Sequence, residues 1–450
     1  MAVGQTGLRR ALGGLAALGL LLALAACGGG GSSSTGDIRV SLPASPASLS
    51  DPNVALVEVR QGVRSNVNIP YVSVTVCQPG AVPSSASCRT IDDVLLDTGS
   101  TGLRLFSSAA NQLSGLVLPA QALTSVPSLY ECAQFLNTVA LGTVNLADVY
   151  MGGDQAHLSQ GGEKAASLPI HLLDTNPPAP DASSPCGQAP RLATTTDAAR
   201  NLQSLSANGI LGVSMFTNDG QGYFSCASYA SGCMLTNVGA GKQVQNPVSS
   251  FGLDSNGVVL QLPALPATGA LSARGFLIFG VGTRANNQLG SAHVVSMNSS
   301  GFYFTTGYKG RNYTMGFLDS GSNGVYFDDP AIPICSGSYT DFYCPINTVT
   351  VSASIPVLGA APVSVNYEVA NANTLFTSVA STGNFAFANL SAPMNNPVPA
   401  IDPLHPNQFN PSFDWGLPFF FGRSVYTVTE GPSPNAATGT LPRPFNAFSN

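Results

Sequence analysis

The sequence predicts a mainly β protein made of two related halves. Charged residues account for only 9% of its 450 residues, while 48 glycines and 33 prolines supply frequent turns, a composition that favours short strands over long amphipathic helices. The stretch LLDTGSTGLRLF at residues 95–106 recurs in similar form as FLDSGSNGVYFD at residues 317–328. Each copy is followed later by an apolar residue and a glycine, Leu211-Gly212 and Trp415-Gly416. A duplicated structural unit accounts for this repeated order.

The N-terminus resembles an export signal. Arg9 and Arg10 precede an apolar run at residues 11–26 that is too short to cross a bilayer comfortably and has the character of a signal-peptide core. The run ends in LAAC, and small residues before Cys27 resemble the lipobox of bacterial lipoproteins, whose cleavage leaves a lipidated N-terminal cysteine. We therefore predict a lipoprotein signal peptide over residues 1–26. The alternative is a plain secretory signal cut at an A-x-A-like site.

The segment after Cys27 has the composition of a linker. GGGGSSSTGD at residues 28–37 is typical of a flexible chain, so we predict a tether over residues 27–55. Gly28 stands where an Asp is linked with inner-membrane retention, which resembles sorting to the outer membrane. We expect a bacterial cell-envelope protein whose lipid anchor binds the membrane, at the outer membrane.

The first predicted lobe, residues 56–284, begins with strands that lead to Asp97. Residues 54–59 and 69–76 have strand composition, and the chain returns through a Pro/Ser loop as a strand at 91–96 that ends beside Asp97. The following segments are a strand–turn–strand pattern at 130–153, an exposed Pro/Ser/Thr-rich loop at 177–198, NGILGVSMF at 208–216, a short helix in NPVSSFGL, and the strands VVLQLP and GFLIFGVG.

The second predicted lobe, residues 285–430, repeats this order. Strands are expected around Val294 and at 302–308, followed by the motif FLDSGS, by strands within 349–367, and by FDWGLPFFFGRSVYTV at 413–428. Residues 431–450 are predicted to form a loose tail.

The eight cysteines beyond Cys27 indicate disulfides, because an even number of cysteines in an exported chain is typical of disulfide-bonded proteins. Closeness in sequence favours three pairs and leaves the fourth by elimination, although other connectivities are open. The predicted pairs are Cys77 with Cys88, Cys226 with Cys233, Cys335 with Cys344, and Cys132 with Cys186.

Charge and histidine spacing exclude two classes of partner. The net charge is −6 and no Lys/Arg cluster exists that could neutralise phosphates, so nucleic acid is not an expected partner. The four histidines show no spacing typical of metal ligands and are expected to be ordinary surface or core residues: His157, His171, His293 and His405. We expect a monomer with no metal and no cofactor.

The repeated motif places Asp97 and Asp319 on two equivalent loops. A carboxylate held on a tight glycine loop between apolar strands is partly desolvated, which raises its pKa. Two such groups that face each other share one proton and supply a base and an acid together. The ionised member can take a proton from a water that attacks an amide carbonyl, while the neutral member stabilises the oxyanion. The hypothesis is a catalytic pair that needs no nucleophilic Ser, Cys or metal.

The residues that follow each Asp have matching predicted roles. These are backbone N–H donors at Gly99 and Gly321, hydroxyl donors to the outer carboxylate oxygens at Ser100 and Ser322, and a lock between the loops by Thr98 and Ser320. A single D-T-G can equally mark a turn in which Asp caps its own backbone. Two copies with matched flanks favour the paired arrangement.

On these motifs the chain resembles the pepsin-type (A1) aspartic peptidases. Their catalytic loops read hhDTG[ST] and hhD[ST]G[ST], like residues 95–100 and 317–322, and a strand ending in glycine crosses behind each loop, as NGILG and FDWG would here at Gly212 and Gly416. The resemblance implies a bilobal pepsin-like fold of two related β-barrel lobes with an active-site cleft between them. It also implies a peptide or protein substrate in that inter-lobe cleft.

A second resemblance is closer but supplies no activity. The lipobox together with CAQF, NGILGV, SSFGLDSNGVVLQLP and FLDSGSNG resembles a family of bacterial lipoproteins catalogued only as a domain of unknown function.

Two departures from the peptidase pattern leave the function open between two hypotheses. Arg104 stands where the family has a Trp-containing strand, and Phe135, the best aligned candidate for the flap Tyr, lacks the hydroxyl. The first hypothesis is an envelope-anchored aspartic endopeptidase, favoured by both intact motifs. The alternative is a noncatalytic envelope lipoprotein that binds a peptide or other ligand on a pepsin-like scaffold, favoured by the missing Tyr. A carbohydrate-binding protein ranks last, because Trp415 is the only Trp and lies in an apolar run.

Overall fold

The computed structural model describes most of the chain from residue 47 onward. The described ranges are 39–41, 47–62, 65–84, 86–107, 113, 115–123, 128–135, 138–153, 162–173, 205–228, 232–394, 410–431 and 441–449. The predicted signal peptide at 1–26, the lipidation site Cys27 and the predicted loop at 177–198 lie outside these ranges.

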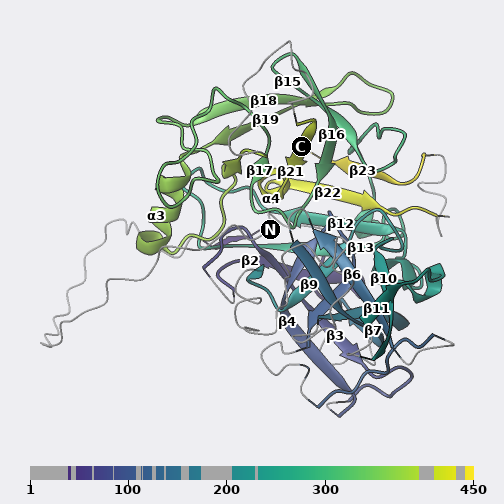
Figure 1. Cartoon of the computed structure of the whole chain (residues 1–450). Coiled ribbons are helices and arrows are strands. Elements are labelled where there is room, and N and C mark those ends of the chain that lie inside the picture. Colours follow the sequence, from purple (N-terminus) through teal and green to yellow (C-terminus); the bar gives the residue numbers. More distant parts are fainter. Residues whose placement is uncertain are drawn as a thin grey trace, which may run out of the picture.

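The prediction of a mainly β protein is confirmed, with strands arranged in two sheets (Figure 1). The larger sheet of sixteen strands has the order β11-β10-β6-β7-β8-β5-β9-β4-β3-β2-β13-β12-β22-β23-β14, and β1 pairs with β13. Its strands are β1 (Arg39–Ser41), β2 (Val54–Val59), β3 (Pro70–Cys77), β4 (Cys88–Asp97), β5 (Thr101–Phe106), β6 (Leu129–Phe135), β7 (Thr138–Met151), β8 (Glu163–Leu173), β9 (Gly209–Val213), β10 (Gly222–Ser228), β11 (Gly232–Leu235), β12 (Gly257–Leu262), β13 (Ser272–Phe279), β14 (His293–Val294), β22 (Arg423–Val428) and β23 (Phe445–Phe448).

The smaller sheet has seven strands in the order β19-β18-β15-β16-β21-β17-β20. They are β15 (Phe304–Tyr308), β16 (Arg311–Leu318), β17 (Val325–Tyr326), β18 (Val349–Ile355), β19 (Val363–Val369), β20 (Ser391–Ala392) and β21 (Ser412–Trp415). The helices are short: α3 (Ala372–Thr382), α4 (Leu417–Phe420) and the 3-10 turns η3 (Ala240–Lys242), η4 (Pro247–Ser250) and η5 (Ala285–Asn287). None of the helices in the described ranges has the length and apolar character needed to cross a membrane.

Helix α3 shows how local sequence sets an element. The Asn371 side chain accepts a hydrogen bond from the Thr374 N–H and caps the first turn. Gly383 ends the helix with a φ of 71°, a left-handed conformation that glycine adopts without the steric penalty of a Cβ.

The two halves share one strand arrangement. In the first half β9 lies between β4 and β5, parallel to β4 and antiparallel to β5. In the second half β21 lies between β16 and β17, again parallel to the first and antiparallel to the second. Each crossing strand ends next to the glycine that follows its apolar run. The repeated sequence order therefore corresponds to a repeated topology.

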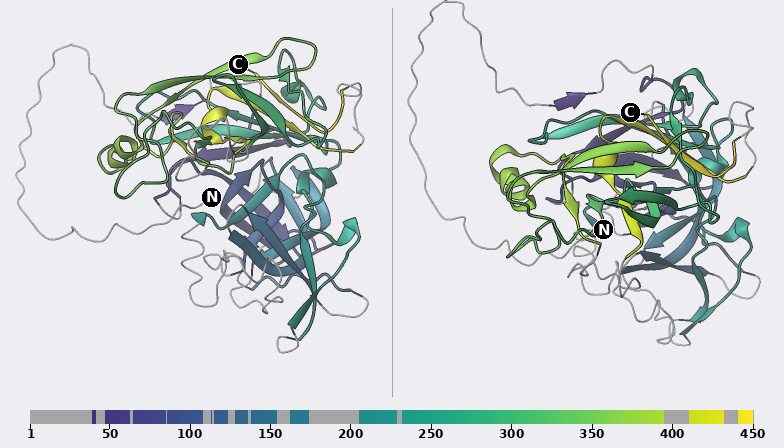
Figure 2. Two further views of the ribbon diagram at one scale, coloured as in Figure 1. Left: turned by 45° about the horizontal axis from the view of Figure 1, so that its top comes forward. Right: turned by 90° about the horizontal axis from the view of Figure 1, so that it is seen from above.

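The strands β12, β13 and β22 lie between the two groups of strands (Figure 1). Strands β3, β4, β7 and β9 of the first half lie below them in this view, and β15 to β19 lie above, with α3 at one side. The left view of Figure 2 shows the same two groups of strands, with those of the first half in blue below those of the second half in green. Strand β22 pairs with β12 over six residues, from Gly257 opposite Val428 to Leu262 opposite Arg423. The larger sheet therefore continues across the predicted boundary at residue 284.

The prediction of a loose tail at residues 431–450 is wrong for its last part. Phe445–Phe448 forms β23, which pairs with β22 and β14, and all four of its residues are buried. Phe445 joins an apolar cluster with Val54 and Tyr426, so burial of its ring supplies the free energy that orders the segment.

The predicted tether at residues 27–55 is too long at its C-terminal end. Ala47 and Asn53 are buried, and the Asn53 amide donates hydrogen bonds to the Phe279 carbonyl at 3.0 Å and to Asn286 Oδ1 at 3.1 Å. Since a buried amide is stable only when it is hydrogen-bonded, these contacts fix the segment to the body. Within the predicted tether, β1 also pairs in parallel with β13.

The disulfides Cys77–Cys88 and Cys335–Cys344 are formed as predicted. The first joins directly opposite residues of β3 and β4. Cys132 and Cys233 each take part in a disulfide. Their predicted partners, Cys186 and the side chain of Cys226, lie outside the described residues.

We predict that replacing Cys77 and Cys88 together by alanine lowers the free energy of unfolding by about 2–4 kcal/mol, because the crosslink restricts the unfolded chain. Urea unfolding of oxidised protein measures the change. Unfolding of the parent with and without reductant provides the control. An unchanged free energy for the variant would show that this hairpin is held by its strand pairing alone.

Candidate active site

Asp97 lies at the end of β4, on a loop that surrounds its carboxylate with donors. Its side chain is 8% exposed. The Gly99 N–H donates to Oδ1 at 2.8 Å, and the Ser100 hydroxyl donates to Oδ2 at 2.5 Å. These are charge-assisted hydrogen bonds when Asp97 is ionised, so they favour its charged form against the effect of burial.

Asp319 follows β16 and has the same set of donors. The Gly321 N–H donates to its Oδ1 at 2.8 Å, and the Ser322 hydroxyl donates to its Oδ2 at 2.8 Å. The two copies of the motif therefore fold in the same way, with the same atoms in the same roles.

The structure brings Asp97 and Asp319 together. Their side chains are hydrogen-bonded to each other. A Cβ added at Gly99 would lie 2.7 Å from the Asp319 carboxyl carbon, and a Cβ at Gly321 would lie 2.7 Å from the Asp97 carboxyl carbon. Each glycine thus leaves space for the carboxylate of the opposite loop.

Thr98 and Ser320 connect the two loops through reciprocal bonds. The Thr98 N–H donates to Ser320 Oγ at 3.1 Å, and the Ser320 N–H donates to Thr98 Oγ1 at 3.0 Å. Each hydroxyl also donates to the strand of the other half, Ser320 to the Leu96 carbonyl at 2.8 Å and Thr98 to the Leu318 carbonyl at 3.4 Å. All four bonds are buried, which strengthens them and holds the loops in register.

The paired carboxyls retain a proton. Burial raises the pKa of Asp97 from 3.8 to about 7, and the charge of Asp319 and the hydrogen bond to it act in the same direction. The donors at Ser100 and Gly99 lower the pKa by less. Two close carboxyls that share one proton present an ionised and a neutral acid side by side, the arrangement needed for combined base and acid action.

Gly212 and Gly416 lie behind the two loops at equivalent places. A Cβ at Gly212 would lie 2.8 Å from the Ser100 carbonyl oxygen, and a Cβ at Gly416 would lie 2.7 Å from the Ser322 carbonyl oxygen. Backbone bonds fasten each loop to its crossing strand, from the Ser214 N–H to the Ser100 carbonyl at 2.9 Å and from the Leu417 N–H to the Ser322 carbonyl at 2.8 Å. Only residues without a Cβ allow the backbones to approach this closely.

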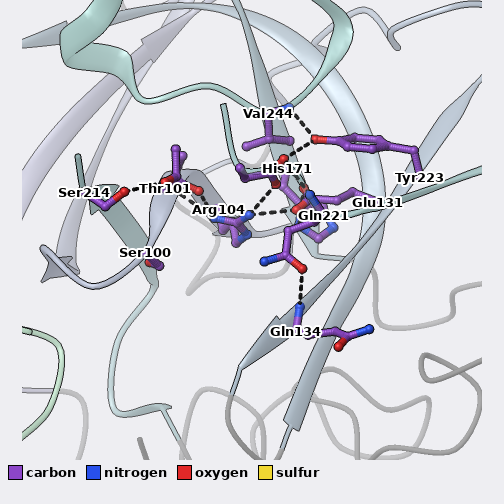
Figure 3. Close-up of polar contacts among 12 residues, drawn as sticks. Ser100, Thr101, Arg104, Glu131, Gln134, His171, Ser214, Gln221, Tyr223 and Val244 are labelled. Carbon is purple, nitrogen blue, oxygen red and sulfur yellow. Dashed lines mark hydrogen bonds and ion pairs between the residues drawn. The ribbon is translucent and has the colours of Figure 1, made fainter. Parts of the chain in front are cut away.

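Arg104 is the centre of a buried charged cluster that was not predicted from the sequence (Figure 3). Its side chain is 1% exposed, and its guanidinium pairs with Glu131 and with Asp219, each at 2.7 Å. It also donates to the Thr101 carbonyl at 2.5 Å, and the Thr101 hydroxyl is 2.5 Å from that of Ser214. The cluster therefore connects strand β6 to the loop that holds Asp97.

His171 and Tyr223 complete this cluster. His171 Nδ1 lies 3.0 Å from Glu131 Oε2, and the Tyr223 hydroxyl donates to Asp219 Oδ1 at 2.7 Å. Burial raises the pKa of Asp219 to about 8, with the nearby Glu131 charge acting in the same direction, and burial lowers the pKa of His171 well below 6.5. The signal available in the sequence was the presence of acidic residues within otherwise apolar strands, as in ECAQF.

Phe135, the flap candidate, lies at the end of β6 beside this cluster. The Arg104 guanidinium carbon is 5.8 Å from the centre of the Phe135 ring, within the range of a cation–π contact. Phe135 pairs with Thr138 of β7, and residues 136–137 between them lie outside the described ranges. The ring therefore contacts the residue at which the chain departs from the peptidase pattern.

Within the described ranges, no group of three His, Cys, Asp or Glu side chains is arranged to hold a metal ion. The chemistry available at the paired loops is that of carboxyls, hydroxyls and backbone N–H groups.

Comparison with known proteins identifies a family. The model of the family described as "Protein of unknown function (DUF3443)" matches residues 50–448. The chain belongs to the DUF3443 family. This agrees with the expected membership of a family without an assigned function, and the match includes both Asp loops and both crossing strands of this DUF3443 protein. No curated protein matches the chain.

We predict that Gly99→Ala lowers the free energy of unfolding by about 1–3 kcal/mol, since its new methyl group would overlap the Asp319 carboxyl and push the loops apart. Gly239→Ala is the control, because a Cβ there meets nothing within 4 Å. Urea unfolding compares the two variants. Equal stability of Gly99→Ala and parent would contradict the close approach of the loops.

We predict that Asp219→Asn changes the pH dependence of stability. Asp219 has a folded pKa of about 8 and an ordinary value of 3.8, so between these values the folded protein holds a proton that the unfolded chain has lost. The free energy of unfolding of the parent minus that of the variant should therefore be greatest below about pH 4 and decline as pH rises to about 8. Thermal unfolding from pH 4 to 8 measures this difference. A difference that is flat or rises with pH would contradict the prediction.

Proposed function

We propose that this DUF3443 protein is an aspartic endopeptidase. The observation that carries the proposal is the hydrogen bond that joins the side chains of Asp97 and Asp319, each of which also accepts from one backbone N–H and one hydroxyl. Buried ion pairs often serve only structure, but two like-charged groups in contact oppose folding when both are ionised. An arrangement that opposes folding and is fully supported by donors is typical of a catalytic site.

In the proposed mechanism, a water lies between the two carboxyls. The ionised carboxylate accepts a proton from this water as its oxygen attacks the carbonyl carbon of a peptide bond. The neutral carboxyl donates its proton to the carbonyl oxygen, whose negative charge develops in the transition state. The proton taken from the water then passes to the leaving nitrogen as the C–N bond breaks. A hydroxyl of the tetrahedral intermediate returns a proton to the other carboxylate as the C=O bond of the product acid forms, so the pair regains its initial protonation state.

We also propose the pepsin-like bilobal arrangement, with an extended peptide bound in a cleft between the lobes. Three features support it: the strand crossing repeated in both halves, the reciprocal bonds of Thr98 and Ser320, and the close approach of Gly212 and Gly416 to their loops. In this arrangement Phe135 lies on the hairpin that would cover the substrate.

The proposed location follows from residues outside the described ranges. A lipidated Cys27 would anchor the enzyme in the bacterial envelope, at the outer membrane. The glycine and serine residues after it would form a flexible linker between the membrane and the catalytic body. We propose that the enzyme acts as a monomer on protein substrates.

A noncatalytic peptide-binding protein is the second candidate. The observation that favours it is Phe135, since this residue lacks a hydroxyl that could contact a substrate or the attacking water. Carbohydrate binding has no comparable support. Trp415 is 1% exposed, and its indole N–H donates to Thr306 Oγ1 at 2.9 Å, so its ring offers no free face to a sugar.

We predict that Asp97→Asn and Asp319→Asn each reduce peptide cleavage by several powers of ten, on the order of the effect of removing an essential member of a catalytic unit. Asn has nearly the same shape but cannot ionise or exchange the shared proton. Cleavage of a peptide library from about pH 3 to 7 measures the loss, because a carboxyl pair shares its proton in that range. A statine-type transition-state mimic should inhibit the parent.

Asp92→Asn is the control for these variants. Asp92 lies on the same strand as Asp97 but is exposed and accepts a hydrogen bond from the Ser73 hydroxyl at 2.6 Å. Cleavage that persists in both Asn variants would belong to another site or protein. A parent that binds peptides but cleaves none across this pH range would favour the binding protein.

A further inference from the structure

A third carboxyl, that of Asp414, lies beside the Asp pair. Asp414 is in the crossing strand β21, opposite Phe317 of β16 and opposite Tyr326 of β17. Its side chain is 1% exposed, and its Oδ1 atom is buried without a hydrogen-bond partner among the described residues. An ionised carboxylate in such a place would have one oxygen without a donor to stabilise its charge.

Asp414 reaches the pair through Ser322. The Ser322 hydroxyl donates to Asp319 Oδ2 at 2.8 Å, and the same side chain interacts with the Asp414 carboxyl. The segment that contains Asp414 also holds this loop, because the Leu417 N–H donates to the Ser322 carbonyl at 2.8 Å. The side chains thus follow one another in the order Asp414, Ser322, Asp319.

In the described part of the first half, the position equivalent to Asp414 holds no carboxyl. In that half Leu95 lies opposite Ile210, at the place where Phe317 lies opposite Asp414 in the second half. Ile210 is apolar and buried, so nothing equivalent to Asp414 supports the Ser100 hydroxyl. The two loops have matching hydrogen bonds from Gly99, Ser100, Gly321 and Ser322, but the strands behind them differ at this position.

The groups around Asp414 favour its neutral form. Burial and the charges of Asp319 and Asp97 raise its pKa well above 3.8, the interaction with Ser322 opposes this shift, and the Tyr326 phenol on the neighbouring strand is itself held neutral by burial. A neutral carboxylic acid has an O–H group that can donate to Ser322 Oγ. The Ser322 hydrogen then points to Asp319, and each donor strengthens the next.

We propose that Asp414 is a protonated positioning residue that orients the Ser322 hydroxyl and thereby assigns the ionised state to Asp319 and the shared proton to Asp97. The catalytic consequence rests on the proposed peptidase function. In that reaction Asp319 takes the proton of the attacking water as the carbon–oxygen bond forms, and Asp97 gives its proton to the former carbonyl oxygen. The proton on Asp319 later moves to the leaving nitrogen as the C–N bond breaks, and a hydroxyl of the tetrahedral intermediate returns a proton to Asp97 as the C=O bond of the product acid forms.

Two substitutions test whether Asp414 acts by donating a hydrogen bond to Ser322 or only by filling space. Asp414→Asn retains a donor to Ser322, so its cleavage rate and pH profile should stay within about threefold of the parent. Asp414→Val removes the donor, which should lower kcat by about tenfold and move the acid limb of the pH profile upward by about one unit, because Asp319 loses stabilisation of its ionised form. KM should change little. Ile210→Val is the matched control in the first half, and its pH profile should equal that of the parent.

Carbon-13 NMR titration of protein labelled at the aspartate carboxyl carbons tests the proposal without any cleavage. The resonance that disappears in Asp414→Asn identifies Asp414, and it should remain that of a protonated acid well above pH 3.8. The resonances lost in Asp319→Asn and Asp97→Asn identify the two members of the pair, and the titration of the pair should differ between the parent and Asp414→Val.

The outcomes are distinct from those of the proposed function. A protein that cleaves no peptide but shows these titrations would lack the peptidase activity and still have the Asp414 arrangement. Titration of Asp414 near pH 4, or dyad titrations and pH profiles that are unchanged in Asp414→Val, would overturn the assignment even for an active peptidase.

Discussion

The reciprocal bonds between Thr98 and Ser320 are the constraint on which the rest of the site depends. They join two loops from the two halves of the chain, and each uses the backbone N–H of one loop and the hydroxyl of the other. Because the bonds are buried, neither hydroxyl can exchange its partner for water without an unsatisfied group remaining. These bonds hold Asp97 and Asp319 in contact. The glycines at 99, 212, 321 and 416 permit the close approach, because a Cβ at any of them would overlap a neighbouring atom. Electrostatic repulsion thus opposes the contact between the two carboxyls when both are ionised, and the hydrogen bonds of Thr98 and Ser320 maintain it.

Several carboxyls in this protein are kept neutral by burial. The pKa of Asp97 and of Glu163 is raised to about 7, that of Asp219 to about 8, and that of Asp414 well above its ordinary value, with burial the largest cause in each case. The contribution of each of these carboxyls to stability is greatest at acid pH, where both the folded and the unfolded chain hold the proton. It declines as pH rises, because the unfolded chain loses the proton first and the folded chain must bind it again. The site and the scaffold are therefore suited to the same range of pH.

Arg104 shows how a buried charge is accommodated in this protein. A buried guanidinium requires hydrogen-bond acceptors, and carboxyl oxygens of Glu131 in β6 and of Asp219 between β9 and β10 accept from it at 2.7 Å each. The resulting cluster holds the Thr101 carbonyl on one side and contacts the Phe135 ring on the other. The connection between the Asp97 loop and the neighbouring hairpin is thus made by charge and a cation–π contact. A change at this position would affect the loop and the hairpin together.

The sequence by itself determined the β character, the duplication, two disulfides and the residues of both Asp loops, because each of these is written locally in turn residues, strand composition, cysteine spacing and the D-[TS]-G-[ST] motif. Only the tertiary structure decided that the segment at 445–448 is a strand, that the segment around Asn53 is packed, and that Arg104, Glu131 and Asp219 form one cluster. It also decided that Asp414 lies next to the Asp pair. These features join residues that are far apart in sequence, and an isolated Asp or Phe in the chain has no local signal of which distant group it will meet. Burial then sets their protonation, since the pKa of a carboxyl depends on the solvent and the charges around it.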